Sequence, residues 1–252
     1  MSLVSTEAII LQTFPYSETS KIARLATREF GVLSVVAKGA RRSKSKFGAN
    51  LQLMSGGSAQ LYFRQTRDLH TLAEFDVETQ RLGLARDIER YAAATALAEL
   101  VIRFSPQQSG PEIYELTRQS LDVLQDADPE QVSTVSLMVM WSGVAGLGFA
   151  PTLGACAVDG ASLTAEDRDF SVPDGGFVCR SCARSRETSR LPVHDCQALS
   201  AFVSGQLPTV SLTAKHLTAH RRLCARFIQR HVSEGRELKG LDFWEEGNGR
   251  AR

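Results

Sequence analysis

A change in hydrophobic period near Gln80 constrains the fold of this chain more than any other feature. Before it, short apolar runs alternate with turn residues, as in β-strands. After it, apolar residues recur at three- and four-residue spacing, as in helices. The predicted strands are 8–11, 22–27, 33–37, 59–63 and 69–77, with turns at Phe30-Gly31, Gly56-Gly57 and 65–68. Five short strands predict a small barrel, and spacing alone does not separate an OB-fold from an SH3-like barrel.

The helical part begins with two amphipathic stripes, which start at Ile88 and Ile113 and are separated by a Pro- and Gly-containing break at 105–111. Residues 132–149 are apolar almost all round and predict a helix buried on most sides. Two more helices are predicted near 195–204 and at 213–231. Segment 151–192 between them is rich in Gly, Asp and Ser, and we expect it to be too polar to form its own core. The predicted organisation is multidomain α+β, with a barrel domain at 1–80 and a helical domain at 81–252 that carries an inserted module at 151–192.

Targeting and membrane segments are not expected. The first residues lack a basic start followed by an apolar run, so no secretory signal is predicted. We expect no window of about 18 uninterrupted apolar residues, the length that spans a bilayer. The nearest run, 135–149, is shorter and contains Trp141 and three glycines. A cytosolic chain is therefore predicted.

The formal net charge of +1 hides a strong asymmetry. Residues 1–67 carry ten Lys/Arg against Glu7, Glu18 and Glu29, a local net of +7, and the rest of the chain has a net of −6. Such asymmetry favours a polyanionic partner for the basic part. The alternative is a solvated basic face without a partner.

Most of this charge lies in one loop that follows the third predicted strand. Glycine and serine separate its cations, and no acid interrupts them, which suits sequence-independent contacts to phosphates. The aromatic residues Phe47 and Tyr62 are near enough to stack on bases, although core packing is the favoured role for both. The predicted DNA-binding residues are Lys38, Arg41, Arg42, Lys44, Lys46 and, after the fourth strand, Arg64.

A Cys-x-x-Cys turn, Cys179 to Cys182, follows a Gly-rich stretch and can present two thiolates to one metal ion. Upstream, Cys156 and Asp159 have the spacing of a second knuckle, with a carboxylate in the last position. The predicted site is one structural zinc held by these four residues, and Cys196 is the rival for the fourth position. A redox pair and a degenerate knuckle that has lost its metal are the alternatives. Cys224 is expected to be a core residue.

A second basic segment is the predicted helix 213–231, which contains no acid. Leu217, Phe227 and Ile228 supply apolar positions beside its cations. Either the cations face water, or they bind an acidic partner, which is DNA or an acidic peptide. The cations concerned are Arg221, Arg222, Arg226 and Arg230.

Catalytic signatures are absent from the sequence. There is no Gly-x-Ser-x-Gly, no His-Glu-x-x-His and no Gly-x4-Gly-Lys-Ser/Thr. We therefore expect a binding protein and not an enzyme.

These features together resemble the RecO family of bacterial recombination mediators over nearly the whole chain. The most specific stretch is N-terminal, and the later Gly-Phe-Val-Cys-x-x-Cys182 resembles the zinc knuckle that many members carry. The N-terminal motifs are the run 8–11, Tyr16-Ser-Glu18-Thr-Ser-Lys21, Thr27-x-x-Phe30-Gly31 and Ala37-Lys-Gly-Ala-Arg-Arg-x-Lys-Ser45. Asp159 departs from the four-cysteine pattern.

The resemblance implies an N-terminal OB-fold, a helical C-terminal domain and a small inserted zinc module. It implies binding to single- and double-stranded DNA, annealing of complementary strands, and loading of RecA with the partner RecR onto strands coated by the single-strand-binding protein SSB. It also implies contact with the acidic C-terminal tail of SSB, and a cytoplasmic, nucleoid-associated location. The alternative is an adaptor for SSB and RecR that binds DNA weakly.

Overall fold

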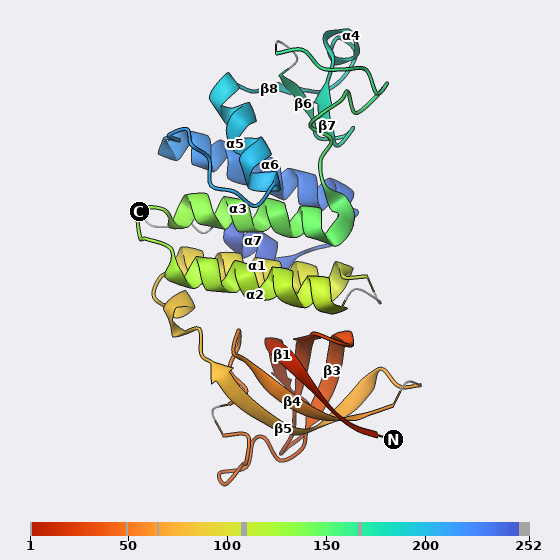
Figure 1. The fold of residues 1–252 in the computed structure, drawn as a ribbon, viewed down its shortest axis with the longest axis vertical. Helices are drawn as coiled ribbons and strands as arrows, with labels where there is room; N and C mark the ends of the chain where they lie inside the picture. Colours follow the sequence, from red (N-terminus) through yellow and green to blue (C-terminus); the bar gives the residue numbers. More distant parts are fainter. Residues whose placement is uncertain (1, 49, 65, 107–109, 166–167, 247–252) are drawn as a thin grey trace. The chain divides into compact units, whose positions relative to one another are not determined.

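The computed structural model describes residues 2–48, 50–64, 66–106, 110–165 and 168–246. By contact density the chain divides into two compact units, Met1–Asp126 and Ala127–Arg252. Figure 1 shows the strands of the first unit in red to yellow and the last helices of the second unit in blue.

Five strands of the first unit form a closed barrel in the order β1-β2-β3-β5-β4 (Figure 1). The long β1 pairs antiparallel with β2 on one side and with β4 on the other. β3 and β5 pair in parallel, from Ser34 opposite Leu69 onward. All five predicted strands are confirmed, each with one or more additional residues. Their bounds are β1 Ser2–Pro15, β2 Lys21–Thr27, β3 Gly31–Ala37, β4 Gly56–Phe63 and β5 Leu69–Thr79.

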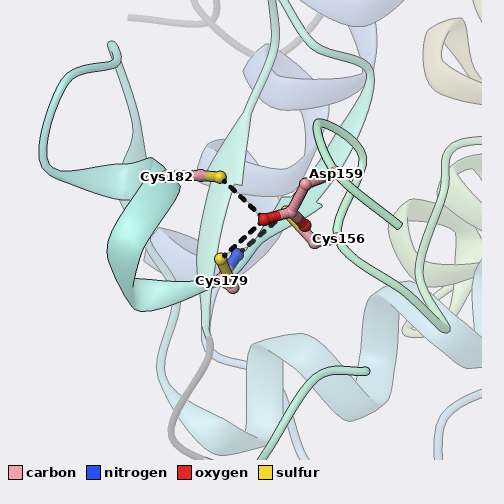
Figure 2. A group of neighbouring side chains, drawn as sticks. All are labelled: Cys156, Asp159, Cys179 and Cys182. Atoms are coloured by element: carbon pink, nitrogen blue, oxygen red, sulfur yellow. Dashed lines mark hydrogen bonds between the residues drawn. The ribbon is translucent and has the colours of Figure 1, made fainter. Parts of the chain in front are cut away.

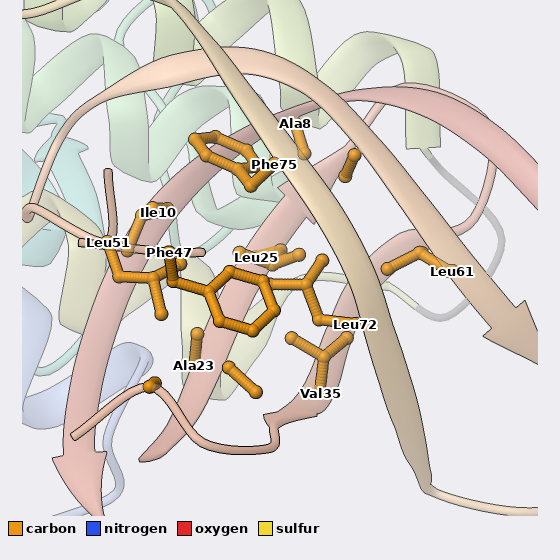
Figure 3. Close-up of a cluster of buried hydrophobic side chains, with 13 residues drawn as sticks. Ala8, Ile10, Ala23, Leu25, Val35, Phe47, Leu51, Leu61, Leu72 and Phe75 are labelled. Atoms are coloured by element: carbon orange, nitrogen blue, oxygen red, sulfur yellow. The ribbon is translucent and has the colours of Figure 1, made fainter. Parts of the chain in front are cut away.

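The barrel core is made of alternating inward-facing side chains from all five strands (Figure 3). Ile10, Leu25 and Leu61 are fully buried in it. Phe47 comes from the loop after β3 and is 2% exposed within the same cluster. Burial of a phenylalanine side chain contributes about 2–3 kcal/mol. Phe47 is therefore a core residue, as the packing interpretation predicted, and is not available to stack on a base.

The Gly56-Gly57 dipeptide is not a turn, contrary to the prediction. Both glycines lie in β4, and Gly57 pairs with Ala8 of β1 and with Val77 of β5. A Cβ atom at Gly57 would lie 1.9 Å from the carbonyl oxygen of Asp76. A glycine is needed here because two neighbouring backbones approach closely where the barrel closes.

Two long helices pack on the barrel within the first unit: α1 (Ile88–Phe104) and α2 (Gly110–Asp126), after the short helix η1 (Leu82–Ala85). The carboxylate of Asp87 caps α1 by accepting a hydrogen bond from the Arg90 N–H at 2.9 Å. The buried Arg90 donates to two carbonyl oxygens in the last turn of α2, those of Leu124 and Gln125. The change from strands to helices near residue 80 was thus predicted. The first two helices nevertheless belong to the compact unit of the barrel.

In the second unit, α3 (Val132–Val144) packs against α5 (Val193–Val203) and α6 (Ala214–His231). The fully buried Trp141 of α3 lies 5.2 Å from the ring of Phe227 on α6. A further helix, α7 (Lys239–Glu246), was not predicted. It buries Trp244 and packs on α6.

One helical stretch of the described residues, Val132–Phe149, is by length and composition apolar enough to cross a membrane. It comprises α3 and the turn η2 (Ala145–Phe149), and serine and threonine interrupt it at four positions, so it is not the uninterrupted apolar window whose absence was expected. However, 61% of this stretch is buried inside the protein, which is the usual behaviour of a core helix.

The inserted segment forms a small three-stranded sheet, β7-β6-β8, with the one-turn helix α4 (Arg180–Ala183). The strands are β6 Asp169–Ser171, β7 Gly176–Val178 and β8 Ser189–Arg190. Its core is shared with a helix of the unit. Phe170 packs edge-on against Phe177 at 5.5 Å and lies 6.4 Å from Phe227 of α6. The segment is too polar to form a core of its own, so its few buried aromatic side chains pack against α6.

Candidate functional site

Three cysteines and one aspartate of the inserted segment meet at one point, with all four ligand atoms within 4.8 Å of one another (Figure 2). The thiols of Cys182 and Cys179 donate to Asp159 Oδ2 over 3.3 Å and 3.7 Å. Cys156 is buried and accepts the backbone N–H of Cys179 at its Sγ over 3.3 Å. The structure thus brings together the four residues that the sequence singled out.

Two tight turns position these side chains. The first turn closes when Gly160 N–H donates to the Cys156 carbonyl and Cys156 N–H donates to the Ala161 carbonyl, at 2.9 Å and 2.8 Å. Gly160 has φ +72°, a left-handed conformation that favours glycine. In the second turn Cys179 precedes α4, and its carbonyl accepts the Ala183 N–H at 2.9 Å. Both turns therefore aim their side chains at a common centre.

The separations between these atoms fit a tetrahedral metal site. Zinc bonds of about 2.3 Å to sulfur and about 2.0–2.2 Å to oxygen give sulfur–oxygen edges of roughly 3.5 Å in a tetrahedron. The two observed sulfur–oxygen distances, 3.3 Å and 3.7 Å, lie on either side of that value. Three sulfurs and one carboxylate oxygen are also a donor set that zinc accepts. The cluster could therefore hold a metal ion.

Local hydrogen bonds shift the protonation of the cluster. Bonds from Cys156, from the Ala161 N–H and from Cys182 lower the pKa of Asp159 to about 2. Desolvation and the neighbouring Asp159 raise the pKa of Cys182 to about 12. The hydroxyl of Ser181 is the main cause of a lowered pKa at Cys179. Asp159 therefore carries the negative charge at neutral pH, beside thiols that a metal ion would have to deprotonate.

The rival ligand Cys196 does not belong to this group. Its thiol contacts the Leu191 carbonyl at 3.8 Å, and burial raises its pKa. Cys224 is fully buried in α6, as expected for a core residue.

All five basic side chains of the loop after β3 are exposed: Lys38, Arg41, Arg42, Lys44 and Lys46. Lys38 and Arg42 line a hollow of about 530 Å³ together with Arg67 and Tyr16. Arg41 anchors the loop on the turn between β1 and β2, because its guanidinium donates to the Ser17 carbonyl at 2.9 Å. The other predicted cations of this part of the chain, Lys44, Lys46 and Arg64, are exposed but do not line this hollow.

Two residues of this hollow were missed by the sequence reasoning. Tyr16 is 58% exposed, and its only sequence signal was its place in the Tyr-Ser-Glu motif. Arg67 lies beyond the fourth strand and reaches the hollow only because β3 and β5 are neighbours in the barrel. Tyr62, the other aromatic candidate, is 39% exposed on β4.

The basic helix α6 divides its cations between two environments. Arg222, Arg226 and Arg230 are exposed. Arg221 is 4% exposed, donates to the Trp244 carbonyl at 3.0 Å and lies over the ring of Trp244. The prediction placed Arg221 on a partner-binding surface, but it faces the core because it shares a helical stripe with Cys224 and Ile228.

The apolar part of that prediction also needs correction. Phe227 and Ile228 are buried in the core and offer no surface. A hollow of about 300 Å³ instead lies between β8, the start of α5 and α6. Its lining includes the arginines Arg190, Arg222 and Arg226 and the apolar residues Leu191, Pro192, Ala219 and Leu223.

Two family domains match the chain: Recombination protein O N terminal over residues 1–81, and Recombination protein O C terminal over residues 85–240. The DNA repair protein RecO of Listeria monocytogenes serotype 4b is 34% identical over 204 residues, which cover 80% of this chain and 77% of the relative. The DNA repair protein RecO of Listeria welshimeri gives the same values. That of Desulfitobacterium hafniense is 33% identical over 183 residues, 72% of this chain and 65% of the relative.

The two matched domains together cover the five-stranded barrel and nearly all of the helical part, and they meet at residues 81–85, where the barrel strands end and the helices begin. The chain belongs to the RecO family, named for recombination protein O.

Proposed function

We propose that this protein is a DNA-binding recombination mediator in DNA repair. It binds single- and double-stranded DNA, anneals complementary strands, and with RecR helps to load RecA onto strands coated by SSB. The observation that carries the proposal is the hollow on the barrel, which Lys38, Arg42 and Arg67 line together with the exposed Tyr16. Cations for phosphates beside an aromatic ring for a base are what a single-strand binder requires.

The barrel itself supports this function. The strand order β1-β2-β3-β5-β4 and the parallel pairing of β3 with β5 favour an OB-fold over an SH3-like barrel. OB-folds bind oligonucleotides through a strand face and the adjoining loops. The basic loop 38–46 follows β3 directly, so its charges adjoin such a face.

Annealing follows from charge neutralisation. Two DNA strands repel each other through their phosphates, and bound cations reduce that repulsion while releasing condensed counterions. Mobile Lys and Arg side chains contact phosphates of any sequence, so one protein serves every pair of complementary strands. This mechanism needs no catalytic group, in agreement with a non-enzymatic mediator.

Zinc is the metal that we propose for Cys156, Asp159, Cys179 and Cys182. Its role is structural, because all four positions of the tetrahedron are protein ligands and none is open for a substrate. Bound zinc would supply a crosslink between the two turns of a segment whose core is otherwise shared with α6.

A protein partner is proposed for the hollow on α6. Arg222 and Arg226 offer planar donors for carboxylates, while Leu191 and Leu223 offer an apolar wall. The tail of SSB is acidic and has a hydrophobic end, so its carboxylates would pair with the arginines and its end would pack on the apolar wall. This hollow also favours the second candidate function, an adaptor that recruits SSB and RecR and binds DNA weakly.

Annealing of complementary strands coated with SSB tests the proposal directly. The wild-type protein should accelerate annealing, and Lys38→Ala/Arg42→Ala should reduce that acceleration without loss of fold. Failure of the wild-type protein to accelerate annealing of either bare or coated strands would refute the mediator function. Bacterial repair of this kind takes place in the cytoplasm on the nucleoid, which is the location we propose.

A further inference from the structure

We propose a second metal site, separate from the cysteine cluster, in which His194, Asp195 and His216 bind one divalent transition-metal ion. These residues lie at the starts of two helices, α5 for the first two and α6 for the third. The candidate ligand atoms, one from each residue, lie within 4.8 Å of one another. The ion would clamp the first turn of α5 to the first turn of α6.

The distances fit coordination by imidazole nitrogen. The Nε2 atoms of His194 and His216 are 3.4 Å apart, and His194 Nε2 is 3.6 Å from Asp195 Oδ2. Metal–nitrogen and metal–oxygen bonds of about 2.0–2.1 Å in a tetrahedron predict edges of roughly 3.3 Å. Two sides of the ligand triangle thus have nearly the length that a shared metal ion requires.

The carboxylate is held in place from behind. Its other oxygen, Asp195 Oδ1, bonds to His220 Nε2 at 3.0 Å, and both residues are buried. The His220 ring is fixed in turn by an edge-on contact with Phe202, with ring centroids 5.5 Å apart. Hydrogen bonds of this kind orient ligating carboxylates in metal sites and leave one oxygen free for the ion.

Hydrogen bonding alone satisfies the three groups poorly. The backbone N–H of Thr213 donates to His216 Nδ1 at 3.4 Å, so the proton of a neutral ring is on Nε2 and points at His194. His194 Nε2 must then accept this hydrogen bond from His216. It therefore carries no proton to donate to Asp195 Oδ2, which lies 3.6 Å away. A metal ion among the three atoms, with the His216 proton on Nδ1 instead, would be bound by the lone pairs of both Nε2 atoms and by the carboxylate.

Metal binding has a defined local consequence. A neutral His216 that coordinates through Nε2 must carry its proton on Nδ1, and the long contact from Thr213 N–H is then lost. The other half of this cap, from the His216 N–H to Thr213 Oγ1, is compatible with the metal. The positive ends of two helices oppose a cation, but this weak field is outweighed by direct coordination and by the charge of Asp195.

The donor set distinguishes this site from the cysteine cluster. Two imidazoles and one carboxylate suit zinc, nickel or copper and lack the soft thiolates of the other group. Three protein ligands leave a fourth position open. His194 has a side-chain exposure of 39%, so that position is accessible to water or to a donor group of a partner.

Metal stoichiometry in the intact 252-residue chain without an affinity tag tests the proposal. Zn²⁺ is added to saturation, free ion is removed, and bound metal is measured by elemental analysis. Wild type should retain two equivalents. His194→Ala/His216→Ala should retain one equivalent, at the cysteine cluster. Cys179→Ser/Cys182→Ser should also retain one equivalent, at the histidine site. Lys215→Ala, an exposed neighbour on α6, is the matched control and should retain two.

Spectra with Co²⁺ identify which ligands are lost. The histidine variant should keep the intense sulfur-to-cobalt charge-transfer band of the cysteine cluster, and the cysteine variant should keep only the weak visible bands of nitrogen and oxygen ligands. Circular dichroism confirms that each variant is folded. One equivalent in wild type, or the wild-type stoichiometry and affinity in the histidine variant, would overturn the second site. Absence of the sulfur-to-cobalt band from the wild-type spectrum would instead refute metal binding by the cysteine cluster.

Discussion

Arg28 donates to Glu115 over 2.6 Å and thereby joins the end of a barrel strand to helix α2. The same guanidinium pairs with Glu7 of β1 and lies 4.7 Å from the ring centroid of Tyr114. The backbone at the start of α2 also approaches the barrel closely here, because a Cβ atom at Gly110 would lie 2.6 Å from the Arg28 carbonyl oxygen. This small region fixes how the helix sits on the barrel.

Acid should weaken this contact. Hydrogen bonds from Arg118 and then Arg28 lower the pKa of Glu115 below its ordinary 4.5, so its contribution is complete above that value and is lost as pH falls through the lowered pKa. The side chains of Arg28 and Glu115 are each about one-third exposed, so we expect their ion pair to add only about 0.5 kcal/mol to the free energy of unfolding. Urea unfolding from pH 6 to pH 3 should show a smaller loss of stability in Glu115→Gln than in wild type. Glu112→Gln, exposed on the same helix, should follow wild type.

DNA affinity should depend on Lys38 and Arg42 at every sequence alike. Replacement of both by alanine removes two phosphate contacts, which should flatten the slope of log K against log salt by about two units. Arg86→Ala, an exposed arginine outside the hollow, should leave the slope unchanged. Fluorescence anisotropy with single-stranded DNA over a salt series measures both quantities. An unchanged slope in the double variant would favour the adaptor function.

Stacking on Tyr16 is a separate contribution. Tyr16→Ala should weaken single-strand binding by about 1–3 kcal/mol, the usual range for a stacked base. Double-stranded DNA, whose bases are already stacked, should lose much less affinity. Tyr62→Ala serves as the control, since it removes an exposed aromatic residue outside the hollow. Equal losses on both kinds of DNA would show that Tyr16 does not contact bases.

Zinc affinity should depend on Asp159 and not on Cys196. Asp159→Ala leaves three sulfurs and should weaken zinc binding, whereas Asp159→Cys should strengthen it by completing a four-cysteine site. Cys196→Ala should have no effect, because its thiol lies outside the cluster. Competition with a chromophoric chelator measures the affinities. Tight zinc in Asp159→Ala together with its loss in Cys196→Ala would reverse this assignment.

Binding of an acidic, hydrophobic-ended peptide should require Arg222 and Arg226. Charge reversal of both, Arg222→Glu/Arg226→Glu, should abolish binding of an SSB tail peptide and leave single-stranded DNA affinity nearly intact. Arg230→Glu is the matched control, because Arg230 is exposed on the same helix but does not line that hollow. Loss of DNA binding with peptide binding retained would assign the helix to DNA.

The sequence predicted the elements well and the assembled sites unevenly. Short-range signals sufficed for the strands, for α1 and for the two cysteine turns, because each depends on neighbours within a few residues. Arg221 was wrongly assigned to a partner-binding surface, because the number of cations in a helix does not show which of them face solvent and which face the core. Arg67 could not be linked to the hollow without the parallel pairing of β3 and β5. His194 and His216 are 22 residues apart and meet only because α5 packs on α6.

The register of β1 sets the order in which the barrel can be made during synthesis. Ser2 pairs with Phe63, so β1 has one of its partners only after about sixty further residues have been added. Until β5 follows, β1, β2 and β3 form a meander with two unpaired edges, which are templates for wrong pairing. Such distant pairings also slow folding. The nascent barrel therefore keeps open edges until Thr79 emerges, and pairing of β5 with both β3 and β4 then covers them.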